Sequence, residues 1–405
     1  MALIVPFRAL RPKPASAARV AAVPYDVVSA QEAHALADGN SLSFLHVSRA
    51  EIDLPAQTDP YSDAVYRKAV ENFETLERQA PLVVEDSPSL YVYRLKMGKH
   101  VQTGVAGTFS IDEYERGVIK KHEHTRPDKE DDRTRHMIEL RAQTGPVFLT
   151  YRASDTVDRI VNDVMRGSPL FDFNAPDGVQ HSIWRVDDAE LRDLQAAFEA
   201  IPSLYIADGH HRAASAARAR QQLRAAAGRH CESDTVLAVA FPDGQMQVLP
   251  YNRVVKDLGS HSPAAFLAKL RDQFAVNEGP ATPATKGQIS MFLDGRWYTI
   301  DLGEAERDAR ATDRLDVSRL QASVLAPLLG IGDVRSDKRI DFVGGARGTS
   351  ELEQLVRSGK YAVAFSLYPV SVDDLMQVCD AGGIMPPKST WFEPKLRDGL
   401  LSHVI

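Results

Sequence analysis

The stretch Ser203–Gly228, SLYIADGHHRAASAARARQQLRAAAG, decides the expected fold because it contains a complete strand-to-helix junction. The apolar run at 203–208 predicts a short buried strand that ends in Asp208. The alanine-rich run after it predicts a helix that Gly228 stops. Gly209 lets the backbone turn tightly between the two elements.

This junction has the residues of an anion site. The first N–H groups of a helix and its positive dipole end attract anions. Arg212 adds donors that match phosphate, and His210 and His211 add groups that titrate near neutral pH. In a plainer interpretation, Asp208 caps the helix and the following residues form its solvated first turn. We favour the anion site, because three cationic or titratable side chains there oppose the helix dipole, and broken local rules point to function.

Strands and helices alternate through the rest of the chain, which predicts an α/β or α+β fold with mixed sheets. The proline-rich start is expected to be extended chain with turns. The pattern at 59–78 predicts an amphipathic helix, and 89–95 with 102–111 predict a β-hairpin. Further strands are expected at 145–151, 236–241, 289–293, 297–302 and 361–368, and further helices from about 128 and at 187–200, 263–274, 317–329 and 372–380. The expected divisions are 1–185 (an α/β region with a charged His/Glu loop), 186–260 (the core that contains the junction) and 261–405 (an α+β region).

Composition narrows the class of protein. The chain has 405 residues, 48 Lys+Arg against 55 Asp+Glu, and a net charge of −7, so no nucleic-acid partner is expected. Two cysteines, Cys231 and Cys379, cannot form a disulfide framework and fit a reducing compartment. No window approaches 18 consecutive apolar residues and no secretory core is evident. We expect a cytoplasmic protein without a membrane partner.

A second candidate segment is the charged run KKHEHTRPDKEDDRTRHMIELRAQ at 120–143. His122 and His124 fall on one side of an extended strand and, with Glu123, could hold a metal. The helical HExxH spacing of zinc proteases is absent. A charged surface loop is the alternative. The segment supplies further candidates for the base, the metal or the phosphate contacts: His122, Glu123, Thr125, Asp132 and Arg133.

A third segment, MPPKSTWFEPKL at 385–396, places Lys388 and Ser389 like the end of a phosphate-binding loop, although the glycines that such a loop requires are missing. The chain also has no G-x-G-x-x-G that opens a βαβ unit and no G-x-S-x-G elbow.

Taken in order, several segments resemble the bacterial and archaeal family known as "domain of unknown function 1015". The matching segments are PFRALRP near the start, VAAVPYDVVS, HVSRAEID, KHEHT with the following KEDDR, GPVFLTY, YIADGHHRAASA, LPYNRVV and MPPKSTWFEPKLRDGL. This resemblance extends over nearly the whole chain, but the family name assigns no reaction.

A narrower resemblance covers about residues 187–220. The helix, strand and DGHHR turn are similar to the strand-turn-helix nucleotide-binding core of ParB/sulfiredoxin-like proteins, and most of all to free-serine kinases. The resemblance implies that the 208–212 turn binds phosphate, that an acidic residue elsewhere acts as base, and that L-serine is phosphorylated from ATP or ADP.

These observations favour a small-molecule phosphotransferase. Backbone groups after Gly209, with His210 and Arg212, would hold phosphate, and Asp208 and His211 are candidate catalytic residues beside Glu123 and Asp132. Arg133, Lys388 and Ser389 could contact the anion from other parts of the fold. Mg²⁺ is expected, with Asp208 as its candidate ligand, because Mg²⁺ usually binds one or two carboxylates plus substrate phosphates. The alternatives are a nucleotide-binding ParB-like switch protein and a metal-dependent phosphatase or other hydrolase built on His122, Glu123, His124, His210 and His211.

Overall fold

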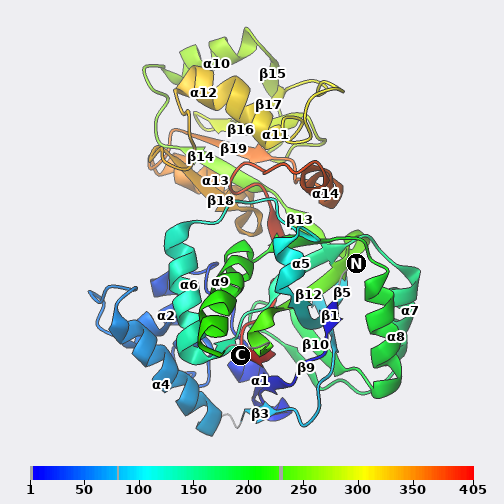
Figure 1. Cartoon of the computed structure of the whole chain (residues 1–405). Coiled ribbons are helices and arrows are strands. Elements are labelled where there is room, and N and C mark those ends of the chain that lie inside the picture. The colour runs from blue at the N-terminus through cyan, green and yellow to red at the C-terminus, as the bar shows by residue number, and fades with distance from the viewer. Residues whose placement is uncertain (1–2, 80–81, 228–230) are drawn as a thin grey trace. The chain divides into compact units, whose positions relative to one another are not determined.

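The computed structural model describes residues 3–79, 82–227 and 231–405, and the chain forms two compact units (Figure 1). Unit 1 comprises Met1–Met246 and Pro394–Ile405, and unit 2 comprises Gln247–Glu393. These limits differ from the divisions expected after residues 185 and 260. Strands from both sides of residue 185 pair within a single sheet, so no boundary falls there.

Unit 1 is built on a nine-stranded mixed sheet in the order β6-β11-β8-β12-β5-β4-β10-β9, with β1 paired to β5. The strands β4 and β5 form the expected antiparallel hairpin, and β11 pairs in parallel with β6 and antiparallel with β8. The strand bounds are β1 Ile4–Val5, β4 Tyr91–Met97, β5 His100–Ser110, β6 Ile119–Lys120, β8 Val147–Tyr151, β9 Phe171–Asn174, β10 Gln180–Arg185, β11 Leu204–Asp208 and β12 Thr235–Pro242.

A four-stranded sheet, β3-β2-β21-β7, ties the end of the chain into unit 1. Its strands are β2 Ala9–Arg11, β3 Val83–Val84, β7 Ala142–Gln143 and β21 Ser402–Val404. The last strand pairs with both β2 and β7, which explains why residues 394–405 belong to unit 1 although unit 2 precedes them in sequence.

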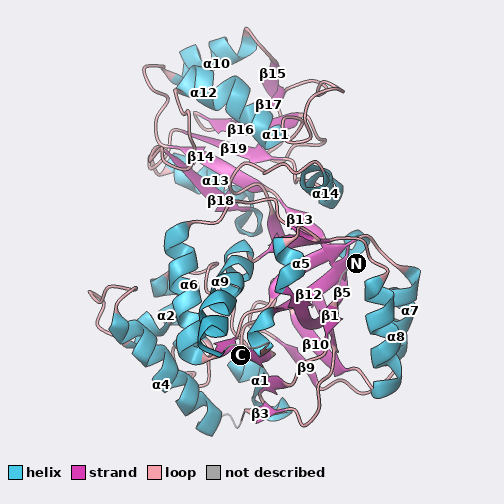
Figure 2. Cartoon of the chain, viewed as in Figure 1, coloured by secondary structure: helices cyan, strands magenta, loops and turns pink. Residues whose placement is uncertain are grey.

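Helices complete unit 1, and Figure 2 shows α6 beside α9 and α7 beside α8. Small residues of α9, among them Ala213, Ala216 and Ser215, are buried and allow this helix to lie close to its neighbours. The Ser215 hydroxyl donates to the backbone oxygen of Glu130 in α6 at 3.2 Å. The helix bounds are α1 Pro14–Val20, α2 Ala30–Ala37, α3 Leu45–Ser48, η1 Ala50–Asp53, α4 Asp63–Gln79, α5 Ile111–Glu115, α6 Pro127–Leu140, α7 Asp155–Val164, α8 Asp188–Glu199, α9 His210–Ala227, η2 Glu232–Asp234 and η3 Asp243–Gln245.

Unit 2 contains a six-stranded sheet in the order β15-β17-β16-β19-β14-β18 and a separate β13-β20 pair. Its strands are β13 Gln247–Leu249, β14 Tyr251–Val255, β15 Ala275–Glu278, β16 Gln288–Leu293, β17 Arg296–Asp301, β18 Ile340–Gly344, β19 Val363–Leu367 and β20 Trp391–Glu393. Its helices are α10 Pro263–Arg271, α11 Asp316–Leu320, the π-helical turn η4 Gln321–Leu325, α12 Ala326–Leu329, η5 Gly345–Arg347, α13 Gly348–Arg357 and α14 Val372–Asp380.

The expected mixed α/β fold is confirmed. The expectation of extended chain at the start was wrong for Pro14–Val20, which is helical with proline in the first turn, where its missing N–H costs nothing. The pattern analysis also missed β9, β10, α2 and α7, although α7 has a clear amphipathic pattern with Val157, Ile160 and Val161 on its buried side. Among the described residues, no helix has the length and apolar character needed to cross a bilayer.

The central strand β8 allows a test of the unit 1 core. Leu149 is 1% exposed there, so Leu149→Ala should leave a cavity and lower the free energy of unfolding of unit 1 by about 2–5 kcal/mol. Leu36→Ala in α2, at a side chain that is 54% exposed, is the matched control and should have little effect. Chemical denaturation followed by circular dichroism measures both, and equal midpoints for the two variants would contradict this placement of the core.

Candidate functional site

The candidate site forms where two parallel strands end. The strand β6 leads into residues 121–126 and then α6, while β11 leads through Gly209 into α9. Ligands of open α/β sheets bind beyond the carboxyl ends of the strands. The parallel pairing therefore brings together the two segments that sequence analysis singled out separately.

Contacts between the two segments are direct. The backbone N–H of His122 donates to His210 Nε2 at 3.4 Å, and the backbone N–H of Arg126 donates to His211 Nε2 at 3.1 Å. The His122 and His210 rings meet edge to face with centroids 4.4 Å apart. Glu123 Oε2 lies 4.0 Å from His210 Nδ1. His122, Glu123, His210 and His211 thus form one cluster.

Both buried imidazoles of this cluster are neutral at pH 7. Burial lowers the pKa of His122 to about 4. Burial, reinforced by the neighbouring His122, also lowers the pKa of His210 well below its ordinary value. Because His210 Nε2 accepts a hydrogen bond, the proton of the neutral ring resides on Nδ1, the nitrogen nearest Glu123. The arrangement pairs a carboxylate with a neutral histidine.

The DGHHR turn has the backbone that its glycine requires. Gly209 has a φ of +90°, and a Cβ there would meet the Arg212 guanidinium at 3.0 Å. Asp208 Oδ2 lies 3.3 Å from both Arg212 Nη2 and Lys395 Nζ. Burial alone would raise the pKa of Asp208, but Lys395 and Arg212 together hold it well below its usual range. Asp208 is therefore ionised and links the turn to the end of the chain.

Arg212 is buried beneath the turn. Its guanidinium donates to the backbone oxygen of Pro146 and lies 3.7 Å from Asp26 Oδ2 in addition to its contact with Asp208. Burial opposes its charge, but Asp26 and Asp208 keep the pKa of Arg212 above its ordinary value. These contacts fix the shape of the turn, so Arg212 acts on the site through Asp208.

Lys395 belongs to the site but was not among the residues selected from the sequence. Its side chain is 10% exposed and comes from the MPPKSTWFEPKL segment, in which Lys388 and Ser389 were selected instead. Those two residues belong to unit 2, where Lys388 Nζ lies 5.6 Å from the centre of the Tyr251 ring and Ser389 donates to the backbone oxygen of Pro386 at 2.6 Å. The segment carried the signal, but its resemblance to a phosphate loop drew attention to the wrong lysine.

Two further acidic residues, Asp26 and Asp398, accompany this group and were also missed. Asp398 is 3% exposed, and its backbone is bridged to Ala22. Burial raises the pKa of Asp398 to about 7, partly opposed by Arg212 and reinforced by Asp26. Asp398 is thus a buried carboxyl that holds its proton in a pH range where an exposed carboxyl has lost it.

The remaining candidates of the charged segment lie around the site rather than in it. Asp132 accepts hydrogen bonds from Tyr66 and Arg133, both at 2.8 Å, and lines a neighbouring cavity. The Thr125 hydroxyl donates to Glu130. The expectation that His122 and His124 share one side of a strand was wrong: residues 121–126 are not a strand, and His122 is buried whereas His124 is exposed.

A metal could be held by His122, Glu123 and His210, whose ligand atoms lie within 4.8 Å of one another. His122 Nδ1 is buried and has no hydrogen-bond partner in the described part of the chain. Two imidazoles and one carboxylate suit Zn²⁺, Mn²⁺ or Fe²⁺ better than Mg²⁺, which prefers oxygen ligands. The oxygen donors that fit Mg²⁺ are the carboxylates of Asp208 and Glu123, and Asp208 already contacts two cations.

The sequence matches the family model described as "Protein of unknown function (DUF1015)" over residues 4–318. No curated protein matches the chain. A conserved hypothetical protein from Pyrococcus furiosus is similar in structure, with 15% identity and a TM-score of 0.36 over 73% of this chain and 94% of that one.

Two further solved structures are similar. A free serine kinase in complex with AMP has 13% identity and a TM-score of 0.36 over 73% of this chain and 92% of its own. SbnI with C-terminal truncation from Staphylococcus aureus has 14% identity and a TM-score of 0.39 over 72% and 85%. At these TM-scores the similarity carries no functional argument.

The raised pKa of Asp398 has a consequence for stability. The folded chain keeps a proton that the unfolded chain releases, so between about pH 4 and 7 this group's contribution to the free energy of unfolding falls as pH rises. Asp398→Asn keeps the shape of the side chain but removes the carboxyl group that titrates. Thermal melting from pH 5 to 8 should show this variant gaining stability relative to wild type as pH rises. Asp193→Asn, at an exposed position of α8, is the control, and parallel wild-type and Asp398→Asn curves would contradict the assignment.

Proposed function

The chain belongs to the DUF1015 family, and we propose that this member is a small-molecule phosphotransferase that transfers a phosphoryl group from ATP or ADP to a hydroxyl compound, with L-serine as the first acceptor to test. The observation that carries the proposal is the Glu123–His210 pair beside the N-terminus of α9 at the ends of two parallel strands. Phosphoryl transfer requires positioned phosphates, positive charge around them and a group that accepts the hydroxyl proton.

The α9 N-terminus and Lys395 supply the positive charge. The first N–H groups of a helix point outward and carry the positive end of its dipole. Lys395 stands at the same turn, because its Nζ lies 3.3 Å from Asp208 Oδ2. His211 lies at the same turn, where its Nε2 accepts a hydrogen bond from the Arg126 N–H at 3.1 Å. Together these groups would orient a nucleotide's terminal phosphates.

Glu123 is the proposed base. Its carboxylate is partly exposed and lies 4.0 Å from Nδ1 of the neutral His210 ring. The acceptor hydroxyl would give its proton to Glu123 as its oxygen attacks the terminal phosphorus and the bond to the leaving nucleotide oxygen breaks. Mg²⁺, if it binds with the nucleotide, would neutralise phosphate charge and use Asp208 as a protein ligand.

Asp208 and Arg212 would act as positioning residues. Asp208 joins Lys395 to the turn, and Arg212 supports Asp208 from below. Removal of the Asp208 charge would release Lys395 from its position and leave the buried guanidinium with Asp26 as its remaining carboxylate contact. Loss of activity in an Asp208 variant would therefore reflect disordered geometry as well as any lost metal contact.

A direct assay tests this function. Full-length protein with ATP or ADP, Mg²⁺ and L-serine should give O-phosphoserine, and Glu123→Gln should lower kcat by about 10²–10⁴-fold, the usual contribution of a general base. Lys395→Met should raise the KM for nucleotide, because it removes a phosphate contact. Asp193→Asn is the control. If Glu123→Gln turns over substrate at the wild-type rate, Glu123 is not the base. If no hydroxyl acceptor gives a phosphorylated product, the protein is not a kinase.

The His122–Glu123–His210 group favours a second candidate, a metal-dependent hydrolase of phosphate esters. In this alternative Glu123 is a ligand rather than a base. Protein purified without chelators should then contain about one Zn²⁺, Mn²⁺ or Fe²⁺ ion per chain by elemental analysis, and His122→Ala should lose it. A metal-free wild-type protein that still produces O-phosphoserine would exclude the hydrolase.

A further inference from the structure

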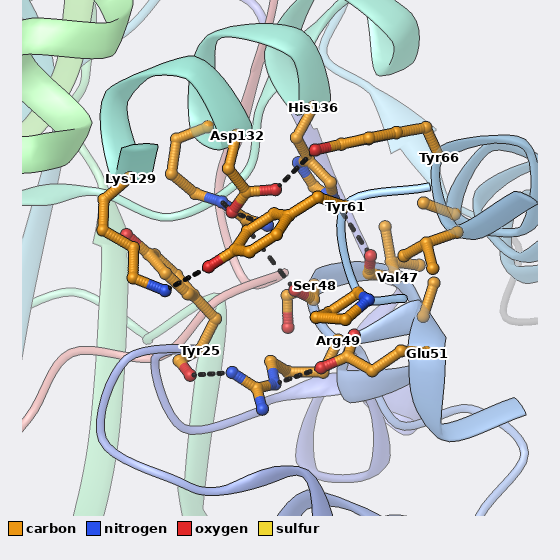
Figure 3. A pocket seen from close by; sticks show the side chains of 15 residues that line it. Tyr25, Val47, Ser48, Arg49, Glu51, Tyr61, Tyr66, Lys129, Asp132 and His136 are labelled. Atoms are coloured by element: carbon orange, nitrogen blue, oxygen red, sulfur yellow. Dashed lines mark hydrogen bonds and ion pairs between the residues drawn. The ribbon is translucent and has the colours of Figure 1, made fainter. Parts of the chain in front are cut away.

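A small cavity in unit 1 is lined by charged, hydroxyl and apolar side chains (Figure 3). Its walls come from α3 and η1, the start of α4, and the buried side of α6. Its volume is about 170 Å³. An engineered protein cavity of about 150 Å³ accommodates benzene, which has six heavy atoms. The cavity therefore fits a molecule of about six to eight heavy atoms and excludes a nucleotide.

The charges around this cavity leave an excess of positive charge. Arg133 is paired with Asp132 at 2.8 Å, and Arg49 with Glu51 at 2.9 Å. Lys129 is the third cation, and its Nζ donates to the Tyr61 hydroxyl at 2.6 Å (Figure 3). Burial, with Arg133 nearby, lowers the pKa of the lining residue His136 to about 4, so His136 adds no charge at pH 7. A ligand with one carboxylate would balance Lys129.

Hydroxyl groups complete the lining. The Tyr66 hydroxyl donates to Asp132 Oδ1 at 2.8 Å. Ser48 is 3% exposed, and its hydroxyl has no hydrogen-bond partner among residues 3–79, 82–227 and 231–405. An unsatisfied buried hydroxyl is costly, and a bound polar molecule would satisfy it. The cavity is thus suited to a ligand that carries a hydroxyl or ammonium group besides its carboxylate.

The neighbouring residues Tyr25 and Asp26 connect this cavity with the charged side chains below the DGHHR turn. The Arg133 guanidinium lies 4.2 Å from the centre of the Tyr25 ring, and both side chains line the cavity. The next residue, Asp26, lies 3.7 Å from Arg212 Nη2. A ligand in the cavity would therefore contact the same wall that supports Arg212 and Asp208.

We propose that this cavity binds a small hydroxy or amino acid of about six to eight heavy atoms, with its carboxylate at Lys129 and with its ammonium group, or the hydroxyl that is not phosphorylated, towards Ser48 and Asp132. Binding is inferred from the cavity itself. The role of this molecule as the phosphoryl acceptor rests on the proposed function. L-serine, with seven heavy atoms, belongs to this class.

Isothermal titration calorimetry of the full chain without nucleotide tests the proposal. The probes are L-serine, L-threonine and glycerate, with glycerol as the probe that lacks a carboxylate. At least one acid should bind saturably, glycerol should bind more weakly, and Lys129→Met should weaken the acid by about tenfold or more, as expected for a lost hydrogen bond to a charged group. Lys269→Met, at an exposed lysine of α10, is the matched control and should bind like wild type.

A second variant, Ser48→Ala, tests the cavity independently in case Lys129→Met fails to fold. Thermal melting of every variant shows whether it is folded. No binding by any acid, or equal affinity in wild type and both cavity variants, overturns the proposal. If the kinase assay gives product but Lys129→Met leaves the KM for the acceptor unchanged, the acceptor role fails and the kinase stands. If Lys129→Met weakens binding but no phosphorylated product forms, the cavity stands and the kinase fails.

Discussion

The parallel pairing of β6 with β11 is the constraint on which the site depends. Two strands that run side by side in the same direction must end at the same edge, and each is followed here by a segment rich in histidine and charge. His122 and His210 are 88 residues apart in sequence but share a hydrogen bond because of this pairing. The packing of α6 against α9 then fixes the directions in which the two segments leave the sheet.

The end of the chain also contributes to the charge balance around the turn in unit 1. Arg212 is buried beneath the turn, and a buried cation without carboxylate partners would be strongly unfavourable. Asp208 and Asp26 contact it, and Lys395 in turn balances Asp208. Asp398 adds a carboxyl whose pKa burial raises to about 7. Residues 394–405 thus contribute both a β-strand and part of the electrostatics of the site.

Local pattern predicted the strand-turn-helix at Leu204–Ala227 and the hairpin of β4 and β5, since in both cases neighbouring residues determine the structure. The meeting of Glu123 with His210 depends on strand order, which no local pattern encodes. The contact of Lys395 with Asp208 was not predicted for a related reason. It depends on the return of the chain through β21 and not on the residues next to Lys395 in sequence. His124 was selected on the assumption of a strand that does not form.

The neutral state of His210 affects how strong a base the neighbouring Glu123 carboxylate can be. A protonated His210 would form an ion pair with Glu123 and make the carboxylate a weaker base. Burial instead keeps the ring neutral, so the carboxylate 4.0 Å from its Nδ1 retains its basicity. In the proposed phosphotransferase, the positive charge for a phosphate would come from Lys395 and the α9 N-terminus, which lie at the turn itself. The proposed base, Glu123, thus precedes α6, whereas the proposed anion-binding groups lie at the start of α9 and at Lys395.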